Sequence, residues 1–461
     1  MEKFFKLKEH GTTVKTEVFA GLTTFFAMAY IIFVNPSMIS YDHSFPAIAN
    51  GVFFATCISA AIGTLLMAFM ANLPFAQAPG MGLNALFAFT AMPTLAALAG
   101  NPDMDPVKQY QMALALVLLS GILFMIITAV GLREAIIEAI PKNIKVAISG
   151  GIGLFICFLG LQNSGLVVNS DATLVELVNF TNLGASKGAI LSIIGLIIIA
   201  VLSYRKVRGA IIISIVATTA LSFLTGNSAM PESFSIDIGA QAADFVNVSL
   251  FKLDFATIFS GGSIGAAVTA IIVLVLSFSM VDMFDSIGTF LGTADKAGLL
   301  DEDGKMPTMR KALMCDAIAT TAGALLGTST VTTYVESAAG IGEGGKTGLT
   351  SLVTGVMFIL ALFVAPFIGL VPACATAPAL IYVGFLMLSG IAKVDFSDIT
   401  EALPAFLTIA MMPLTYSIAN GIAFGLISYV LLKLFSGRVK DIHITTVVLA
   451  GLFIVKYFVA I

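Results

Sequence analysis

The sequence predicts an all-α polytopic membrane protein with about 14 transmembrane segments, arranged as two inverted seven-span repeats. Three observations predict this class. The 461 residues are 58% hydrophobic and 11% charged, whereas a soluble domain carries about 25% charged residues. Apolar runs long enough to cross a bilayer recur along the chain. The basic residues gather in alternate loops. A soluble enzyme, a disordered chain and, at a net charge of −4, a nucleic-acid-binding protein are excluded.

The candidate spans are apolar runs bounded by charges, Pro/Gly clusters or polar loops. In chain order they cover residues 18–36, 50–72, 80–97, 111–132, 146–162, 187–203, 209–225, 264–294, 311–327, 329–341, 347–367, 376–391, 402–415 and 417–436. A further apolar run at 443–460 is either a fifteenth span or a helix at the membrane interface. We favour the interfacial helix.

The distribution of basic residues orients these spans. With the N-terminus in the cytoplasm, most of the 23 Lys and Arg residues fall in inside segments, and the outside segments hold only Lys108, Lys187 and Lys252. Because cytoplasmic loops carry an excess of Lys and Arg, we expect a multi-pass protein of the cell (inner) membrane with a cytoplasmic N-terminus.

An odd number of spans in each half requires the second half to run upside down in the membrane. The two stretches 204–225 and 416–437 also resemble each other, each placing a Gly near the head of a short apolar span. We therefore divide the chain into four parts. The first repeat covers residues 1–225, an extracytoplasmic connector covers 226–263, the second repeat covers 264–437, and a C-terminal tail covers 438–461.

Two of the spans are short and broken. The third opens AQAPGMGLNALF (Ala76 to Phe87), where Pro and Gly disfavour continuous helix, and the tenth reads GTSTVTTYVESAAGIG (Gly327 to Gly342), where β-branched residues favour extended backbone. We expect short extended strands leading into half helices. Unpaired backbone at this depth is tolerated only beside a protein-lined cavity, so the paired breaks indicate a binding site. The alternative is a simple kink between packed helices.

Acidic residues inside the spans are the next indication of a site, because a buried carboxylate is costly and usually faces a cavity or a partner. Asp285 and Glu336 are the deepest pair. Asp282, one helical turn before Asp285, and Asp316, in the first turns of the ninth span, are secondary candidates with structural roles as the alternative.

The expected pocket has no Lys or Arg beside these acids, which disfavours a fixed anion as its ligand. It offers instead the Asn84 amide, the hydroxyls of Thr332 and Ser286, and the aromatic faces of Phe26 and Phe87. Such groups suit a neutral, planar ligand that forms hydrogen bonds, such as a nucleobase. For each Phe, core or lipid contact is the alternative role.

Other motifs point away from enzymatic chemistry. Residues Gly340 to Thr347 read GIGEGGKT and match the P-loop pattern, but they join two apolar spans instead of following a strand of a soluble α/β sheet. We interpret them as a tight cytoplasmic turn without ATP hydrolysis. The four Cys residues are isolated, so neither a metal nor another cofactor is expected. An intramembrane aspartyl protease is disfavoured because the one Tyr-Asp pair, Tyr41-Asp42, lies in a loop.

Four motifs resemble the AzgA-like purine permeases, a branch of the nucleobase/ascorbate transporter superfamily. They are AGLTTFFAMAYIIFVNP (Ala20 to Pro36), APGMGLNA (Ala78 to Ala85), FDSIGTFLG (Phe284 to Gly292) and TTYVESAAGIGEGGKTGL (Thr332 to Leu349). The resemblance, which runs nearly end to end, implies a core domain of spans 1–4 and 8–11 and a gate domain of spans 5–7 and 12–14. It also implies a homodimer that meets through the gate domains, and a substrate site between the half helices.

The resemblance implies which residues of this chain form that site. At the positions that match the family motifs, its acids are Asp285 and Glu336 and its amide is Asn84. The resemblance implies uptake of purine nucleobases together with H⁺, driven by the proton gradient without a cofactor. We expect Glu336 to be the main purine contact and Asp285 to serve in coupling or share the contact. The stretch FICFLGLQNSGLVV (Phe155 to Val168) favours hypoxanthine and guanine. An adenine-preferring permease and an anion exchanger or channel on the same fold are the alternatives.

Overall fold

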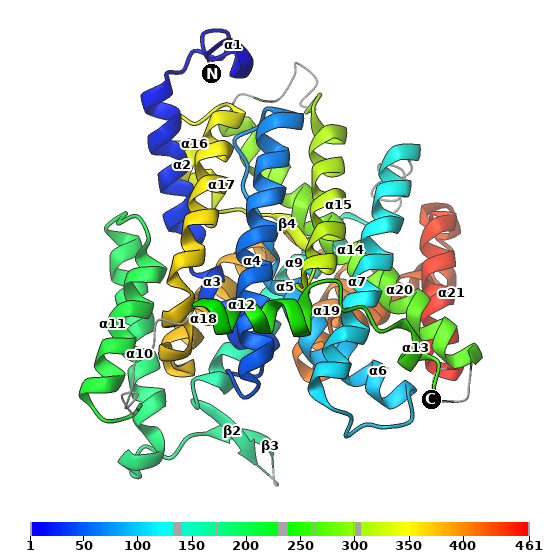
Figure 1. Ribbon diagram of the computed structural model, residues 1–461. Coiled ribbons are helices and arrows are strands. Elements are labelled where there is room, and N and C mark those ends of the chain that lie inside the picture. The colour runs from blue at the N-terminus through cyan, green and yellow to red at the C-terminus, as the bar shows by residue number, and fades with distance from the viewer. Residues whose placement is uncertain are drawn as a thin grey trace.

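The computed structural model describes residues 2–131, 141–170, 173–228, 238–261, 264–297, 299 and 306–459. Ten helices in this part of the chain are long and apolar enough to cross a membrane, and three shorter apolar helices accompany them. Figure 1 shows most of these helices running in the same general direction through one bundle. The predicted all-helical, multi-pass class is confirmed.

In the first half, a short N-terminal helix precedes the first long span, which is divided at Ala29 and Tyr30. A small hairpin of two strands, absent from the sequence prediction, joins α9 to α10. The elements are α1 (Glu2–Phe5), α2 (Val14–Met28), α3 (Ile31–Ile39), α4 (Pro46–Leu66), β1 (Gln77–Pro79), α5 (Met81–Leu86), α6 (Met92–Leu98), α7 (Pro106–Val130), α9 (Lys142–Asn163), β2 (Val167–Ser170), β3 (Leu174–Leu177), α10 (Leu183–Tyr204) and α11 (Ala210–Leu224).

The second half repeats this plan after two short connector helices. The longest helix, α14, contains both Asp282 and Asp285. The elements are α12 (Ile238–Asp244), α13 (Phe255–Ile258), α14 (Ile264–Ala297), α15 (Met309–Leu326), β4 (Val331–Thr333), α16 (Ser337–Gly342), α17 (Gly348–Ala361), α18 (Ala373–Leu388), α19 (Ile399–Leu414), α20 (Ile418–Phe435) and α21 (Ile444–Val459).

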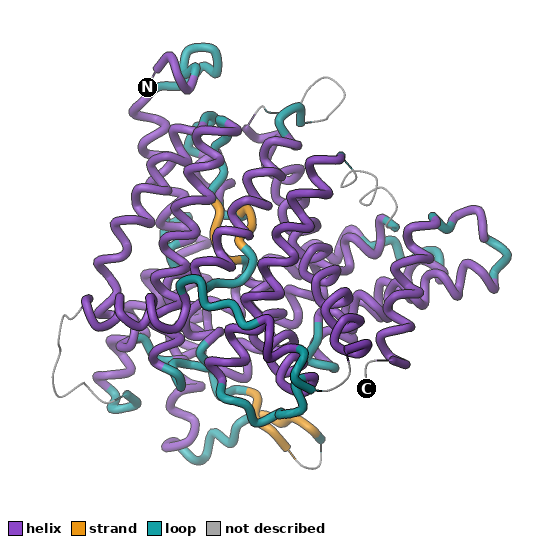
Figure 2. Tube along the Cα trace, turned by 45° about the vertical axis from the view of Figure 1, so that its right-hand side comes forward, coloured by secondary structure: helices purple, strands orange, loops and turns teal. Residues whose placement is uncertain are grey.

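The broken third and tenth spans meet inside the bundle. Strands β1 and β4 pair antiparallel, with Ala78 opposite Thr332, so the extended backbone of each satisfies the other. Figure 2 shows this pair surrounded by helices and well separated from the β2–β3 hairpin at one end of the molecule. The predicted strands ahead of two half helices, α5 and α16, are therefore confirmed.

The helices pack in two groups. One contains α2, α4, α7, α15 and α17 around the strand pair, and the other contains α9, α10, α11, α18, α19 and α20. Close packing in the second group depends on glycine: a Cβ added to Gly153 of α9 would lie 2.7 Å from the carbonyl oxygen of Gly384 on α18. The high glycine content thus permits the backbones of α9 and α18 to touch.

The P-loop-like segment binds a carboxylate from its own chain. Glu17 of α2 is fully buried, and its side chain accepts hydrogen bonds from the backbone N–H groups of Lys346 (2.9 Å), Thr347 (3.3 Å) and Thr350 (3.1 Å). The hydroxyls of Thr347 and Thr350 donate two more, at 2.9 and 2.7 Å. The N-terminus of α17 is therefore occupied by an internal anion that fixes α2 against α17.

The C-terminal helix α21 lies lengthwise against α20. The Tyr457 hydroxyl, near the end of α21, donates a 2.9 Å hydrogen bond to Oδ1 of Asn420 at the start of α20. The rings of Tyr457 and Phe424 stand edge to face with centroids 6.1 Å apart. Since α21 begins close to where α20 ends, the two helices are antiparallel over most of their length.

Candidate substrate site

A small cavity, the polar cavity, lies where the strand pair meets the half helices, and acidic, hydroxyl and apolar side chains line it. Its volume is about 50 Å³, and the residues that line it are Tyr30, Gly80, Met81, Gly82, Asp285, Thr289, Thr333, Tyr334, Val335, Glu336, Val383 and Met387. They come from the break in the first span, both half-helix segments, α14 and α18. Spans from both halves of the chain thus contribute to one cavity.

The two deep acids line this cavity together. Asp285 comes from the middle of α14, and Glu336 is the residue that caps the N-terminus of α16. Strand β4 ends three residues before Glu336, and its pairing with β1 fixes where α16 begins. The sequence predicted that these two carboxyl groups would converge, and both contribute to the walls of the cavity.

Tyr30 is a cavity residue that the sequence analysis missed. It occupies the junction between α2 and α3, where the chain leaves regular helix for two residues. Its hydroxyl donates a 2.7 Å hydrogen bond to Oε1 of Glu336. The available signal was a tyrosine in an otherwise apolar stretch of the first span, since a buried tyrosine usually directs its hydroxyl to a partner.

Asp316 lies behind the strands and not among the cavity-lining residues. It accepts a 3.0 Å hydrogen bond from Nε2 of Gln77 on β1, a 3.3 Å bond from Thr333 on β4 and a 2.6 Å bond from Ser286 on α14. The Ser286 and Thr332 hydroxyl oxygens are 2.7 Å apart. Asp316, Ser286 and Thr332 thus join α15, both strands and α14 into one buried network.

The structure does not bring the remaining candidates to the cavity. Asn84 is fully buried, and its Oδ1 accepts a hydrogen bond from the Ser329 hydroxyl. Phe87 packs edge to face on Tyr110 with centroids 6.0 Å apart. Phe26 is 45% exposed and lines a different, apolar cavity.

The placement of these candidates follows from helix phase. Phe26 lies one helical turn before Tyr30, but the chain leaves regular helix between α2 and α3, so Tyr30 and not Phe26 reaches the site. Asp282 is buried one turn before Asp285 on α14 and does not line the cavity. Hydrophobicity alone could not assign these residues to one face of their helices.

A cavity lined by acidic side chains at paired helix breaks, inside a bundle of membrane-crossing helices, is the arrangement of a membrane transporter. Residues 15–424 match the sequence model of the Permease family, Xan_ur_permease. The chain is 41% identical to adenine permease AdeP of Escherichia coli (strain K12), an alignment that covers 99% of this chain and 95% of AdeP. The chain belongs to this permease family, and it is a multi-pass membrane permease and not an enzyme.

Further relatives and solved structures agree with this assignment. Guanine/hypoxanthine permease PbuO of Bacillus subtilis (strain 168) is 41% identical, with 99% of this chain and 100% of PbuO covered. The transmembrane domain of the cyanobacterial bicarbonate transporter BicA superposes with a TM-score of 0.64 at 15% identity, covering 88% of this chain and 97% of that one. SLC26A9 superposes with a TM-score of 0.64 at 12% identity over 92% of this chain and 66% of that one. The two solved structures share the inverted-repeat fold.

Proposed function

We propose that this permease takes up purine nucleobases together with protons. The observation that carries the proposal is that Asp285 and Glu336, from different spans, line one cavity inside the bundle. Relatives about 40% identical over the whole chain include adenine and guanine/hypoxanthine permeases, which supports the purine class without separating its members. We retain hypoxanthine and guanine as the preferred substrates, with adenine as the alternative.

The chemistry of the cavity suits a base better than an anion. A carboxylate accepts N–H groups from the edge of a purine, and Tyr30 occupies one oxygen of Glu336, leaving the other oxygen for substrate. No lysine or arginine is among the described residues that line the cavity. This disfavours an anion exchanger on the same fold, since two carboxyl groups in the cavity would repel an anion and no cationic side chain offsets them.

A purine can enter the cavity only if the helices around it move. The cavity volume of about 50 Å³ has room for a few water molecules and not for a bicyclic base. Val383 and Met387 of α18 line the cavity together with residues of the half-helix segments. We assign α18 and its packing partners to the gate domain and the group around the strand pair to the core domain. Rocking of one group against the other would then open the cavity alternately to each side.

Proton coupling assigns complementary roles to the two acids. One of Asp285 and Glu336 would carry the proton inward while the other accepts purine N–H bonds. The energy would come from the proton gradient, with no cofactor bound. A homodimer formed through the gate domains, as the family resemblance implies, completes the proposed assembly.

Uptake assays in a purine-permease-deficient cell test the function. We expect labelled hypoxanthine or guanine to accumulate faster at lower external pH. Unlabelled bases should compete with this uptake, and sulfate or bicarbonate should not.

The variants Glu336→Gln and Asp285→Asn should each reduce uptake roughly ten- to one hundred-fold, as expected for hydrogen bonds to charged groups. Asp103→Asn and Glu176→Gln, in exposed loop and hairpin positions, are the matched controls. If both site variants transport at the parental rate, the assignment is wrong.

The sidedness of the chain is part of the proposal. Most basic residues favour a cytoplasmic N-terminus in the cell membrane. Because α21 runs antiparallel along α20, the geometry favours a crossing helix, with the C-terminus outside, over the interfacial helix that the sequence favoured. Labelling of single cysteines at the two termini with an impermeant reagent in intact cells distinguishes these topologies: only a C-terminal cysteine should react.

A further inference from the structure

A second cavity, larger than the polar one, is lined wholly by apolar side chains. Its volume is about 300 Å³, and its walls include Phe26 of α2, Phe33 of α3, Ile212 of α11 and Leu360 of α17. It shares no lining residue with the Asp285–Glu336 cavity. Water does not fill a hollow of this composition favourably, so an apolar occupant is expected.

The apolar lining of the cavity indicates an opening toward the bilayer. Phe26 and Leu360, at its walls, are 45% and 50% exposed. Its walls come from both helix groups: α11 stands on one side, and α2, α3 and α17 stand on the other. Figure 1 shows the α10–α11 hairpin at the periphery of the bundle, beside α2 and α17.

Basic residues lie beside this cavity. The loop between α10 and α11 contains Arg205, Lys206 and Arg208, all exposed, and it ends three residues before the wall residue Ile212. Gly209 adopts a positive φ of 71°, and a Cβ at this position would lie 3.3 Å from the backbone oxygen of Phe26. The loop is therefore held against the part of α2 that forms the cavity.

Two of these three cations have no carboxylate partner among the residues that the structure describes. Arg208 forms an ion pair with Glu343. Arg205 and Lys206 form no ion pair with any residue in the described part of the chain. A positive pair beside an apolar hollow is complementary to a molecule with an anionic head and a hydrocarbon tail.

We propose that the cavity binds one acyl chain of an anionic phospholipid from the surrounding bilayer, with the phosphate of its headgroup at Arg205 and Lys206. The lipid fills the seam between α11 and the α2–α17 pair. The site is independent of the transported solute. Each basic residue beside an anionic headgroup strengthens binding about five-fold, so removing both should weaken it roughly twenty-five-fold.

The absence of tryptophan from the sequence permits a direct test. A single tryptophan is introduced at Leu360→Trp, in the cavity wall, and in a separate protein at Ile359→Trp, which is 45% exposed on the same helix but does not line the cavity. The two positions differ in depth by about 1.5 Å along the helix axis. Each purified full-length protein is reconstituted in phosphatidylethanolamine vesicles containing a minor fraction of phosphatidylglycerol, with brominated chains on one lipid or the other.

We expect brominated phosphatidylglycerol to quench the fluorescence of the Leu360→Trp protein several-fold more strongly than brominated phosphatidylethanolamine at equal mole fraction, and the Ile359→Trp protein to show no such preference. Arg205→Gln with Lys206→Gln should abolish the preference, whereas Lys3→Gln with Lys440→Gln, an equal change of charge at exposed positions, should preserve it. Equal quenching by the two lipids, absent quenching, or a preference that survives Arg205→Gln with Lys206→Gln would overturn the proposal.

Discussion

The phenol of Tyr30 donates a 2.7 Å hydrogen bond to Oε1 of Glu336, so the break in the first span is joined to the break in the tenth. The bond crosses from one half of the chain to the other, and both residues line the polar cavity. It fixes the orientation of the carboxylate at the position where we propose that the base binds. Tyr30 is thus a positioning residue for Glu336.

Tyr30→Phe should weaken transport without unfolding the protein, because it removes the donor and leaves the ring. A hydrogen bond to a charged group contributes about 1.5–3 kcal/mol, so we expect a loss of roughly ten-fold or more in the ratio Vmax/KM for purine uptake. Tyr41→Phe is the matched control, since the Tyr41 hydroxyl donates to the Ala88 carbonyl oxygen at 2.7 Å, outside the cavity. Unchanged uptake by Tyr30→Phe would contradict the positioning role.

The parts of the site that the sequence predicted are those with a high physical cost in a membrane. Pro79 and the Val331–Thr333 run disfavour continuous helix, and Asp285 and Glu336 would be costly facing lipid, so each feature indicated a nearby cavity. The roles of Tyr30 and Asp316 depend instead on which helix faces meet and on the register of β1 against β4. Those features are set by tertiary packing, which hydrophobic patterning does not specify.

Asp316→Asn should destabilise the protein and not change its substrate recognition. Gln77 and Thr333 donate to Oδ1 of Asp316 and Ser286 donates to Oδ2, so either orientation of the asparagine amide sets its NH2 group against at least one of these donors. An unsatisfied buried group costs about 1–3 kcal/mol, which predicts a lower midpoint of thermal unfolding in detergent. The KM for the transported base should stay near the parental value. A normal unfolding midpoint combined with an altered KM would place Asp316 in the site.

Glu17→Gln should weaken the contact between α2 and α17 and so lower the free energy of unfolding. The carboxylate accepts five hydrogen bonds, and a glutamine amide replaces one accepting oxygen with a donor that opposes the N–H groups of the α17 N-terminus. We expect a loss of about 2–4 kcal/mol in the free energy of unfolding, since bonds to a charged acceptor are stronger than neutral ones. Exposed Glu2→Gln is the control. ATP should not protect either protein against unfolding, because the P-loop-like amides already bind Glu17.

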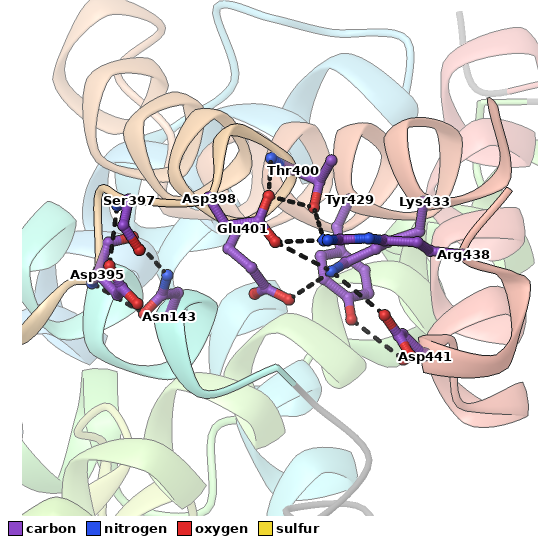
Figure 3. A network of polar contacts seen from close by, with 10 residues as sticks. All are labelled: Asn143, Asp395, Ser397, Asp398, Thr400, Glu401, Tyr429, Lys433, Arg438 and Asp441. Carbon is purple, nitrogen blue, oxygen red and sulfur yellow. Dashed lines mark hydrogen bonds and ion pairs between the residues drawn. The ribbon is translucent and has the colours of Figure 1, made fainter. Parts of the chain in front are cut away.

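The ends of α19 and α20 are held by a network of charges around Lys433, shown in Figure 3. The Lys433 side chain is only 3% exposed, and its Nζ lies 2.9 Å from Glu401, 3.7 Å from Asp441 and 3.9 Å from Asp398. Lys433→Met leaves three neighbouring carboxylates without their shared cation. We expect destabilisation of about 1–3 kcal/mol, below that of a fully buried pair because the acids are partly exposed. Lys433→Arg should recover most of the loss; equal stability of Lys433→Met and wild type would contradict the role of the cation.

The ionisation of Asp398, in the same network, should make the stability of this part of the protein depend on pH. Hydrogen bonds from the Thr400 backbone N–H and hydroxyl, together with the Arg438 guanidinium, lower the pKa of Asp398 to about 2. A carboxyl with a depressed pKa in the folded state stabilises the protein above its unfolded pKa of about 3.9, and this contribution is lost as the pH falls toward 2.

The variant Asp398→Asn tests this contribution, because it keeps an oxygen for capping α19 but loses the charge. The difference in unfolding midpoint between wild type and Asp398→Asn should therefore stay constant between about pH 5 and 8 and shrink below about pH 4. It should also decrease in high salt, because the pair with Arg438 is exposed. A difference that disappears already near neutral pH would show that Asp398 is not held ionised by these partners.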